Sequence, residues 1–271
     1  MYTYTIQAPC QTRYTIRTNC PDLVRSLALK HGKYLCSQES CSDNIITALK
    51  EHDTFQILFN NKHIDKILGI NCNFPLPIIE DIMYDHRQYD ANIFAIHGAA
   101  VEYNKEAYLF IAATTSGKTT LTAYLTANGL GYLTDDCILL DKNNFTISPF
   151  NTPLHLRDGG YEVLKKLNLL PESLELLDDI SFKRYVYTPD NCIDKPLPLK
   201  RIFFITRTES ENCLVEMNTT ERITSLLKSP IKEYKPDGRL LQFLSRLSKI
   251  PCHTLHYCDM DYVLEVITGE Q

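Results

Sequence analysis

The sequence has no apolar run that approaches the ~20 residues a membrane-spanning helix needs. Its start, MYTYTIQAPC, lacks the basic and then apolar pattern of a signal peptide. We therefore expect a cytoplasmic protein with no membrane partner. The sequence also lacks a basic surplus, since its formal net charge is -5 and its pI is near 5.9. A nucleic-acid partner is therefore not expected.

Closely paired cysteines are also absent, because the ten cysteines include no CxxC pair. The densest local group is PCHTLHYCD, which contains Cys252, His253, His256 and Cys258. As a strand, this segment would turn its two cysteines and His256 to one face and His253 to the other, and no second ligand pair accompanies it. We interpret it as a core strand rather than a zinc site, and the cysteines as small hydrophobic residues of a reducing compartment.

The first part of the chain has strand-like and helical patterns but no chemical motif. The 271 residues, 44% of them hydrophobic and 23% charged, can bury a full core and fit one large or two small domains. Within residues 1–90, short strand-like runs, TYTIQA, TRYTIRT and TFQILFN, precede the helical spacing of LPIIEDIMYDHRQY. We predict a small α+β module here, which binds a substrate or partner or supports the rest.

Residues 91–271 have a different character and predict an α/β domain, so that the whole chain is α+β. A strand, a small-residue loop, a helix and a strand form one βαβ unit around residue 117, preceded by a hairpin at Asn104 and Lys105. Strands are expected in NIFAIHGAAVEYN, KEAYLFIAA, GYLTDDCILLD, LKRIFFITR and CHTLHY. Helices are expected in SGKTTLTAYLTANG, at about 160–168, 220–228 and 238–248, and from Asp259.

The segment YLFIAATTSGKTTLTAYL, residues 108–125, follows the phosphate-binding pattern GxxxxGK[ST] except at its first position, which is Ala112. Phosphate binding needs a tight loop whose amides point inward at a helix N-terminus, with a lysine for the phosphates and a hydroxyl for magnesium. An alanine at position 112 costs on the order of 1 kcal/mol only if the backbone there needs a positive φ. We therefore predict a nucleotide site formed by Thr114, Thr115, Ser116, Gly117, Lys118, Thr119 and Thr120.

Two adjacent acids, Asp135 and Asp136, follow sixteen residues after Thr119, within what the sequence predicts as one apolar strand. Because neighbouring carboxylates are costly to bury without a cation or a proton, they indicate a magnesium site near the loop. His97 and Gly98 lie in the strand before the hairpin. Taken alone, that histidine is most simply structural.

The order HGAAV, a hairpin, AATTSGKTT, a helix and LTDDCILL resembles the HPr kinase/phosphorylase family, whose core is related to phosphoenolpyruvate carboxykinase. More specifically, the chain is similar to shorter members found with peptide-modification systems, including kinases of lasso-peptide precursors. The resemblance covers roughly residues 91–271 and implies a P-loop kinase core with a mixed sheet. Later segments follow the usual order of that group: SPFNTPLHLRDG, KRYVYTPD, PLKRIFFITR, MNTTERITSLLKSP and PCHTLHYCDMDYVLEVI.

This resemblance implies ATP as the phosphate donor and Mg²⁺ as the cofactor. Gly117, Lys118 and Thr119 would bind the nucleotide phosphates and magnesium, with Lys118 also catalytic. Asp135 would accept the proton of the attacking hydroxyl, and Asp136 would hold magnesium together with Thr119. The two aspartates could exchange these roles.

The resemblance further implies that His97 lies beside the transferring phosphoryl group, as a hydrogen-bond donor or a proton relay. Arg157, in LHLRDGG, falls where the family places a catalytic cation or polar group, and Lys183 and Arg184 are expected to act similarly. HPr kinases form rings, so a homo-oligomer is one expectation. The chain lacks the extended carboxylate-rich signature with which those enzymes also remove phosphate, so phosphorylase activity is not expected.

We therefore expect an ATP- and Mg²⁺-dependent kinase that phosphorylates a hydroxyl, most simply a serine or threonine of a peptide or protein such as a ribosomally made precursor peptide. One alternative is a small-molecule kinase for a sugar, amino acid or nucleoside. Another is a nucleotide-binding pseudokinase or adaptor, which retention of both aspartates disfavours. A GTPase is disfavoured because no NKxD motif follows the acids, and DKNN at 141–144 is better interpreted as a turn.

Overall fold

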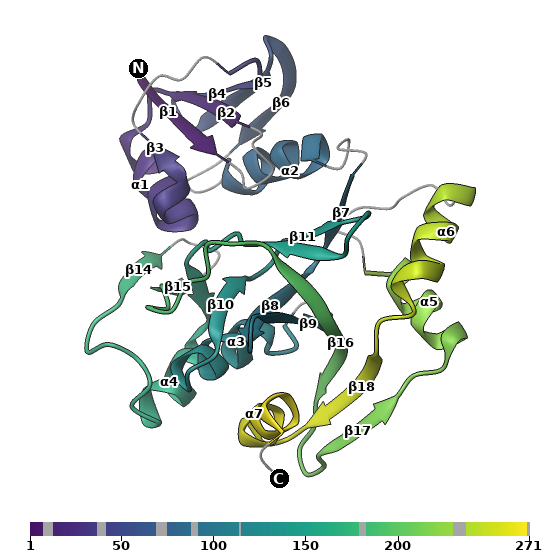
Figure 1. Cartoon of the computed structure of the whole chain (residues 1–271). Helices are drawn as coiled ribbons and strands as arrows, with labels where there is room; N and C mark the ends of the chain where they lie inside the picture. Colours follow the sequence, from purple (N-terminus) through teal and green to yellow (C-terminus); the bar gives the residue numbers. More distant parts are fainter. Residues whose placement is uncertain are drawn as a thin grey trace.

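Three β-sheets with helices packed against them make up the described part of the computed structural model (Figure 1). The predicted α+β character of the chain, with mixed sheets, is confirmed. The structure describes residues 1–7, 13–36, 42–68, 75–87, 92–113, 115–178, 183–229 and 237–269.

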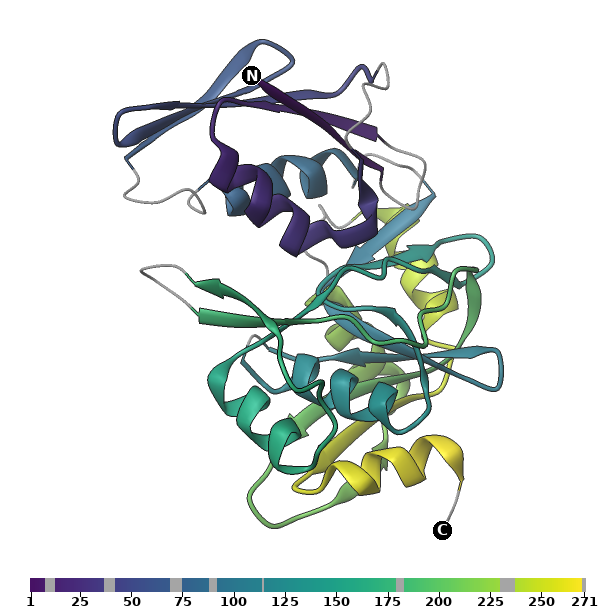
Figure 2. The same ribbon diagram turned by 90° about the vertical axis from the view of Figure 1, so that its left-hand side faces the viewer.

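The first sheet belongs to the N-terminal part of the chain and has the strand order β3-β1-β2-β4-β5-β6. Its apolar face packs on α1 (Pro21–His31) and α2 (Leu76–Arg87), in a core that includes Ile16, Leu27 and Ile79. Figure 2 shows both helices lying between this sheet and the rest of the molecule. The strands are β1 (Tyr2–Gln7), β2 (Arg13–Thr18), β3 (Leu35–Cys36), β4 (Ile45–Glu51), β5 (Thr54–Phe59) and β6 (Lys62–Leu68).

The second sheet is the central one, and it mixes parallel and antiparallel pairs in the order β10-β8-β9-β16-β12-β11-β7. β16 runs parallel to both β9 and β18, and β17 continues the sheet beyond β18. Its strands are β7 (Ile93–Ile96), β8 (Gly98–Tyr103), β9 (Glu106–Ile111), β10 (Gly131–Thr134), β11 (Ile138–Asp141), β12 (Thr146–Ser148), β16 (Leu197–Arg207), β17 (Cys213–Glu216) and β18 (Cys252–Tyr257).

Helices cover both faces of the central sheet. α5 (Thr219–Leu227) and α6 (Gly238–Leu247) pack on one face, while α3 (Lys118–Ala127), α4 (Asp158–Lys166) and α7 (Met260–Thr268) pack on the other. β9 therefore alternates between two cores, with Leu109 facing α5 and α6 and Phe110 facing α3 and α7. This double burial explains why its sequence reads as a continuous apolar run. A small third sheet, β13-β15-β14, consists of β13 (Leu154–Leu156), β14 (Glu175–Asp178) and β15 (Lys183–Tyr187).

The predicted βαβ unit and its preceding hairpin are both present. β8 and β9 pair up to Tyr103 and Glu106, which leaves Asn104 and Lys105 as a two-residue turn with φ of 54° and 63°. β9, α3 and β10 then follow one another, and β8 lies between β9 and β10 in the sheet. The loop before α3 is thus fixed between a central strand and a buried helix.

Two segments that the sequence predicts as single strands are each broken, so those predictions were wrong. NIFAIHGAAVEYN divides into β7 and β8 at His97, and GYLTDDCILLD divides into β10 and β11 at residues 135–137. The reason is long-range pairing: β7 pairs with β11, whereas β8 pairs with β9 and β10 elsewhere in the sheet. The chain passes from one of these regions to the other twice, once at His97 and once at residues 135–137. The acid pair therefore lies in a turn and not inside a strand.

The Cys and His segment forms β18, and its prediction as a core strand is confirmed for residues 252–257. Cys252 and Leu255 are buried, while Cys258 follows the end of the strand and is exposed. Among the residues that the structure describes, no group of three or more His, Cys, Asp or Glu side chains could hold a metal ion. The predicted division of the chain at residue 90 stays a prediction.

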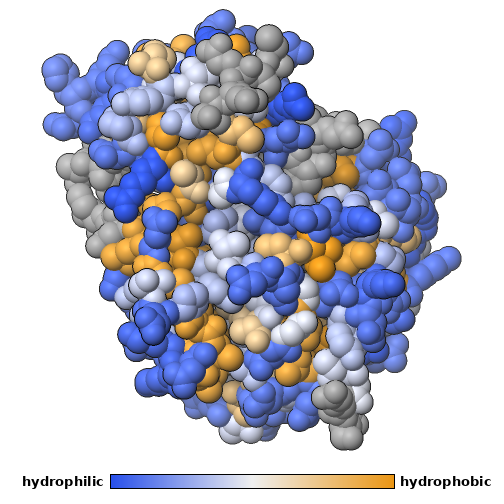
Figure 3. Space-filling model, turned by 60° about the vertical axis from the view of Figure 1, so that its left-hand side comes forward, coloured by the Kyte–Doolittle hydropathy of each residue, from blue (hydrophilic) through white to orange (hydrophobic). Residues whose placement is uncertain are grey.

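The molecular surface mixes hydrophobic and hydrophilic side chains. On the face shown in Figure 3, a band of hydrophobic surface is interrupted by hydrophilic groups. None of the helices in the described ranges is long and apolar enough to cross a membrane.

Gly98 is needed because β8 approaches β9 closely beside His97. A Cβ at this position would lie 2.6 Å from the carbonyl oxygen of Phe110 and 3.3 Å from Leu109 Cδ1. We predict that Gly98→Ala lowers the free energy of unfolding by about 1–3 kcal/mol, measured by urea denaturation, because the sheet must shift. Gly238→Ala, at an open position at the start of α6, is the matched control and should be neutral or stabilising. Equal stability of the two variants would contradict the close approach.

Candidate active site

The loop between β9 and α3 contains two described residues with positive φ. Gly117 is the N-cap of α3 and has a φ of 90°, in the left-handed region that favours glycine. Thr115 also has a positive φ, of 71°. Ala112 is not among the described residues with positive φ, so the alanine in place of the usual glycine introduces no left-handed strain. Thr114, the first residue predicted to bind nucleotide, lies outside the described residues.

Lys118 folds back over this loop. Its Nζ donates hydrogen bonds to the carbonyl oxygens of Ala112 at 2.8 Å and Ala113 at 3.1 Å. Burial lowers the pKa of Lys118, and the charges of Asp135 and Asp136 only partly offset that effect. The lysine therefore lies inside the pocket, close to both carboxylates, in the position that a phosphate-binding cation requires.

Thr119 joins the loop to the first of the two acids. Its hydroxyl donates to Asp135 Oδ2 at 2.7 Å, while Asp135 Oδ1 is buried without a hydrogen-bond partner among the described residues. Burial, together with the charge of Asp136, raises the pKa of Asp135 to about 7, despite the Thr119 hydrogen bond. A hydroxyl and a carboxylate with an unsatisfied oxygen form a donor set that fits Mg²⁺, which prefers oxygen ligands.

Asp136 has a different environment. It is exposed, lines the pocket and has a φ of 65°, which aspartate tolerates better than most residues. The resemblance implies magnesium binding by Asp136 and proton acceptance by Asp135, or the exchanged roles. The geometry favours the exchanged roles, because Asp135 is buried against the loop hydroxyl while Asp136 faces the pocket.

His97 lies in the break between β7 and β8, opposite the turn that contains the acids. Its Nδ1 is 3.1 Å from the carbonyl oxygen of Asp136, and since a carbonyl only accepts, Nδ1 carries the proton. Burial and the charge of Lys118 lower the pKa of His97, although Asp136 opposes them. The neutral ring then has Nε2 as an acceptor, which suits a proton relay better than a hydrogen-bond donor.

The predicted cations after the acids do not all reach the pocket. Arg157, the N-cap residue of α4, lines it, and so does Arg184 from β15. Lys183 does not line the pocket: its Nζ lies 3.6 Å from Asp158 and 4.8 Å from the centre of the Tyr185 ring. Because successive residues of a strand face opposite sides, only one of the pair Lys183 and Arg184 can face the pocket, so the prediction for Lys183 was wrong.

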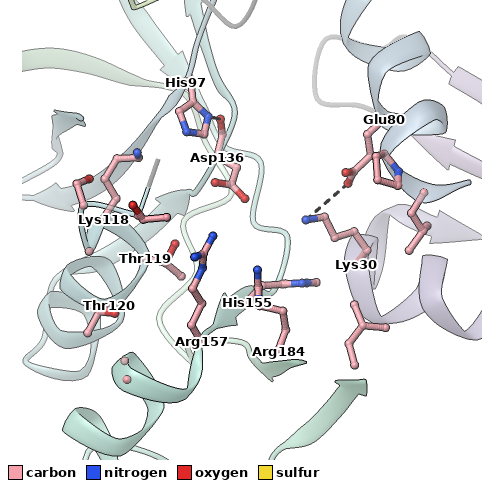
Figure 4. Close-up of a pocket in the computed structure, with 18 of the residues that line it drawn as sticks. Lys30, Glu80, His97, Lys118, Thr119, Thr120, Asp136, His155, Arg157 and Arg184 are labelled. Carbon is pink, nitrogen blue, oxygen red and sulfur yellow. Dashed lines mark hydrogen bonds and ion pairs between the residues drawn. The ribbon is translucent and has the colours of Figure 1, made fainter. Parts of the chain in front are cut away.

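Most of the predicted nucleotide and catalytic residues line one cavity of about 550 Å³, whereas Asp135 is buried behind it and is not part of its lining. Figure 4 shows Lys118, Thr119 and Thr120 on one side, Lys30 and Glu80 on the opposite side, and Asp136 and Arg157 between them. α4 approaches closely, since a Cβ at Gly160 would lie 2.3 Å from Thr120 Oγ1.

Four charged or ionisable residues that the sequence did not indicate also line the cavity. Lys30 Nζ lies 3.8 Å from Glu80 Oε1, and both come from the N-terminal helices. Arg207 stands at the end of β16, the parallel neighbour of β9, so its place at the end of a buried strand was a usable signal. No local sequence pattern indicates that Lys30, Glu80 or His155 belongs to a site. The four residues are Lys30, Glu80, His155 and Arg207.

No protein-family model and no curated protein matches the chain. Among solved structures, the chain is similar to the Hpr(Ser) kinase/phosphatase from Coxiella burnetii, with 14% identity and a TM-score of 0.34. That similarity covers 64% of this chain and 91% of that chain. Because the superposition is weak, the function proposed below depends on the side chains of the site.

Asp135 is buried with one carboxylate oxygen unpaired among the described residues, and this makes the free energy of unfolding depend on pH. The folded-state pKa of about 7 lies above the ordinary value of 3.8, so the folded state retains a proton that the unfolded state releases, and stability falls as pH rises between these values. We predict that Asp135→Asn in metal-free buffer raises the free energy of unfolding at pH 8 relative to the unsubstituted protein, and that this gain shrinks by pH 4. A gain of equal size at both pH values, measured by urea denaturation, would contradict the origin in the buried carboxylate.

Proposed function

We propose that this protein is an ATP- and Mg²⁺-dependent kinase that transfers the γ-phosphoryl group to a serine or threonine hydroxyl of a peptide or protein. The observation that carries the proposal is the 2.7 Å hydrogen bond between Thr119 and Asp135, immediately after Gly117 and Lys118. A left-handed glycine, a lysine and a threonine bonded to a buried acid together match what a metal-bound triphosphate requires.

Thr119 and Asp135 would hold the metal ion, since Asp135 Oδ1 is the buried oxygen that lacks a partner among the described residues. When bound, Mg²⁺ neutralises charge on the nucleotide phosphates. Lys118 adds positive charge at the loop, which supports stabilisation of the transferring group.

Asp136 is the group best placed to accept the proton of the acceptor hydroxyl, because it faces the pocket between the loop and the opposite wall (Figure 4). In the transfer, the acceptor oxygen forms a bond to the γ-phosphorus, the bond from that phosphorus to the bridging oxygen breaks, and ADP leaves. The hydroxyl proton passes to Asp136. His97, held through Nδ1 by the Asp136 carbonyl, can take up that proton at Nε2.

The choice of a peptide hydroxyl rests on the resemblance of HGAAV, AATTSGKTT and LTDDCILL to kinases of peptide-modification systems. The pocket geometry supports phosphoryl transfer to a hydroxyl of any origin. Asp136 and the pocket cations argue against a pure adaptor, because an adaptor does not need an acid exposed beside the loop.

Two matched substitutions should separate the roles of the acids. We expect Asp136→Asn to lower kcat by roughly 10²- to 10⁴-fold and to leave Mg²⁺-dependent ATP binding nearly unchanged, because it removes only the base. Asp135→Asn should weaken ATP binding in Mg²⁺ but not in EDTA, measured by calorimetry. Lys118→Ala should lose both binding and transfer of labelled phosphate.

The opposite pattern, with metal dependence lost in Asp136→Asn and retained in Asp135→Asn, would restore the first assignment of the two acids. Full phosphoryl transfer by both Lys118→Ala and Asp135→Asn would rule out this loop and acid as the site of the proposed kinase reaction. Absence of transfer by the unsubstituted protein to any hydroxyl would rule out the kinase proposal.

A further inference from the structure

The wall of the pocket that faces the phosphate-binding loop comes from the N-terminal helices (Figure 4). Lys30 belongs to the last turn of α1, and Glu80 belongs to α2, whose first residues, Leu76 and Pro77, line the same cavity. Both helices lie between the first sheet and the rest of the molecule (Figure 2). The N-terminal part of the chain, which has no chemical motif, thus forms one wall of the cavity.

Lys30 is held in this wall as a cation. Burial lowers its pKa, but the carboxylates of Glu80, Asp136 and Asp135 outweigh burial and raise the pKa above its ordinary value. Arg184 acts on the same ammonium group in the opposite direction. Lys30, Asp136 and Arg184 also line the same cavity.

Two guanidinium groups, those of Arg157 and Arg184, border the same cavity. Burial and the charge of Arg157 lower the pKa of Arg184, although Asp136 and Asp158 oppose this effect. In the ranges that the structure describes, the Arg157 side chain forms no ion pair or hydrogen bond. Several cations that line one cavity favour the binding of an anion there.

The nucleotide has room that does not involve these cations. A second hollow of about 340 Å³ adjoins the loop and is lined by Ala113, residues 115–117 and residues 205–207. It shares Arg207 and the loop with the larger cavity, whereas Lys30, Arg157 and Arg184 line the larger cavity only. A nucleoside seated beside the loop would leave those three cations to the acceptor.

We infer that Lys30, Arg157 and Arg184 form an anion-binding subsite for the acceptor, and that the acceptor is a peptide with a carboxylate beside its reactive hydroxyl. This inference rests on the proposed kinase function and names its substrate class. Lys30 contributes from the wall opposite the loop, so a bound carboxylate lies on the far side of Asp136 from the phosphates. Glu80, 3.8 Å from Lys30, competes with that carboxylate for the ammonium group.

Two synthetic peptides test the subsite: one with a serine between two aspartates, and one with asparagines in their place. Anisotropy of a fluorescent label measures binding without nucleotide, and mass spectrometry measures phosphorylation with ATP and Mg²⁺. We expect the aspartate peptide to bind and react about tenfold better, as charge-assisted hydrogen bonds predict. Lys30→Met should remove most of this preference.

Lys33→Met is the matched control, because Lys33 is an exposed lysine of the same module that pairs with Asp194 at 2.7 Å outside this cavity. It should keep the preference. Glu80→Gln should strengthen binding of the aspartate peptide, since it removes the competing carboxylate. Opposite signs for Lys30→Met and Glu80→Gln distinguish recognition from a merely structural contact, which both variants would weaken.

Equal binding of the two peptides by the unsubstituted protein would overturn the subsite, as would weaker binding of the aspartate peptide in Glu80→Gln. Loss of ATP binding in Lys30→Met, with the peptide preference intact, would assign Lys30 to the nucleotide and overturn it too. A clear binding preference without transfer to either peptide would support the subsite and contradict the proposed kinase. If Lys30→Met does not fold, as judged by circular dichroism, Glu80→Gln decides the test.

Discussion

The hydrogen bond from Thr119 to Asp135 is the contact on which the site depends. It joins the loop after β9 to the turn after β10, two segments that β8 separates in the sheet. Burying this carboxylate is unfavourable, as its raised pKa shows, and the Thr119 hydroxyl, a backbone hydrogen bond at Asp136 and the charge of Lys118 offset only part of the cost. The remaining oxygen of Asp135, buried without a partner among the described residues, is the physical reason to expect a cation there.

The breaks in two strands place the other groups around that bond. The central sheet holds β7 and β11 at one end and β8 and β10 at the other. The chain must therefore leave regular strand pairing twice, at His97 between β7 and β8 and at the acids between β10 and β11. The breaks meet where His97 contacts the Asp136 carbonyl. An acid in a regular strand would have its side chain directed by the pleat, whereas the turn directs one aspartate into the protein and the next toward the pocket.

Local patterns predicted much of this correctly. The helices, the hairpin at Asn104 and Lys105, and the loop before α3 follow from spacing and turn chemistry within a few residues. Strand breaks depend on pairing between β7 and β11, some forty residues apart, and no local pattern encodes that partner. The same limit hid Lys30 and Glu80, since only the packing of α1 and α2 brings them to the pocket.

The N-terminal helices α1 and α2 contribute charged side chains to the candidate site. They place one lysine and one glutamate on the wall opposite the loop before α3, in a cavity whose other side holds the groups proposed for phosphoryl transfer. An enzyme that binds its donor on one side and its acceptor on the other gains most of its rate from such positioning.

Transfer of an isotopically labelled γ-phosphate from ATP to a serine peptide in Mg²⁺ tests the central claim most directly. The proposed mechanism predicts labelled phosphate on the serine of the peptide, formed in step with ADP, when both products are followed by mass spectrometry. Label that appears only in free phosphate, or that stays in ATP, would contradict it.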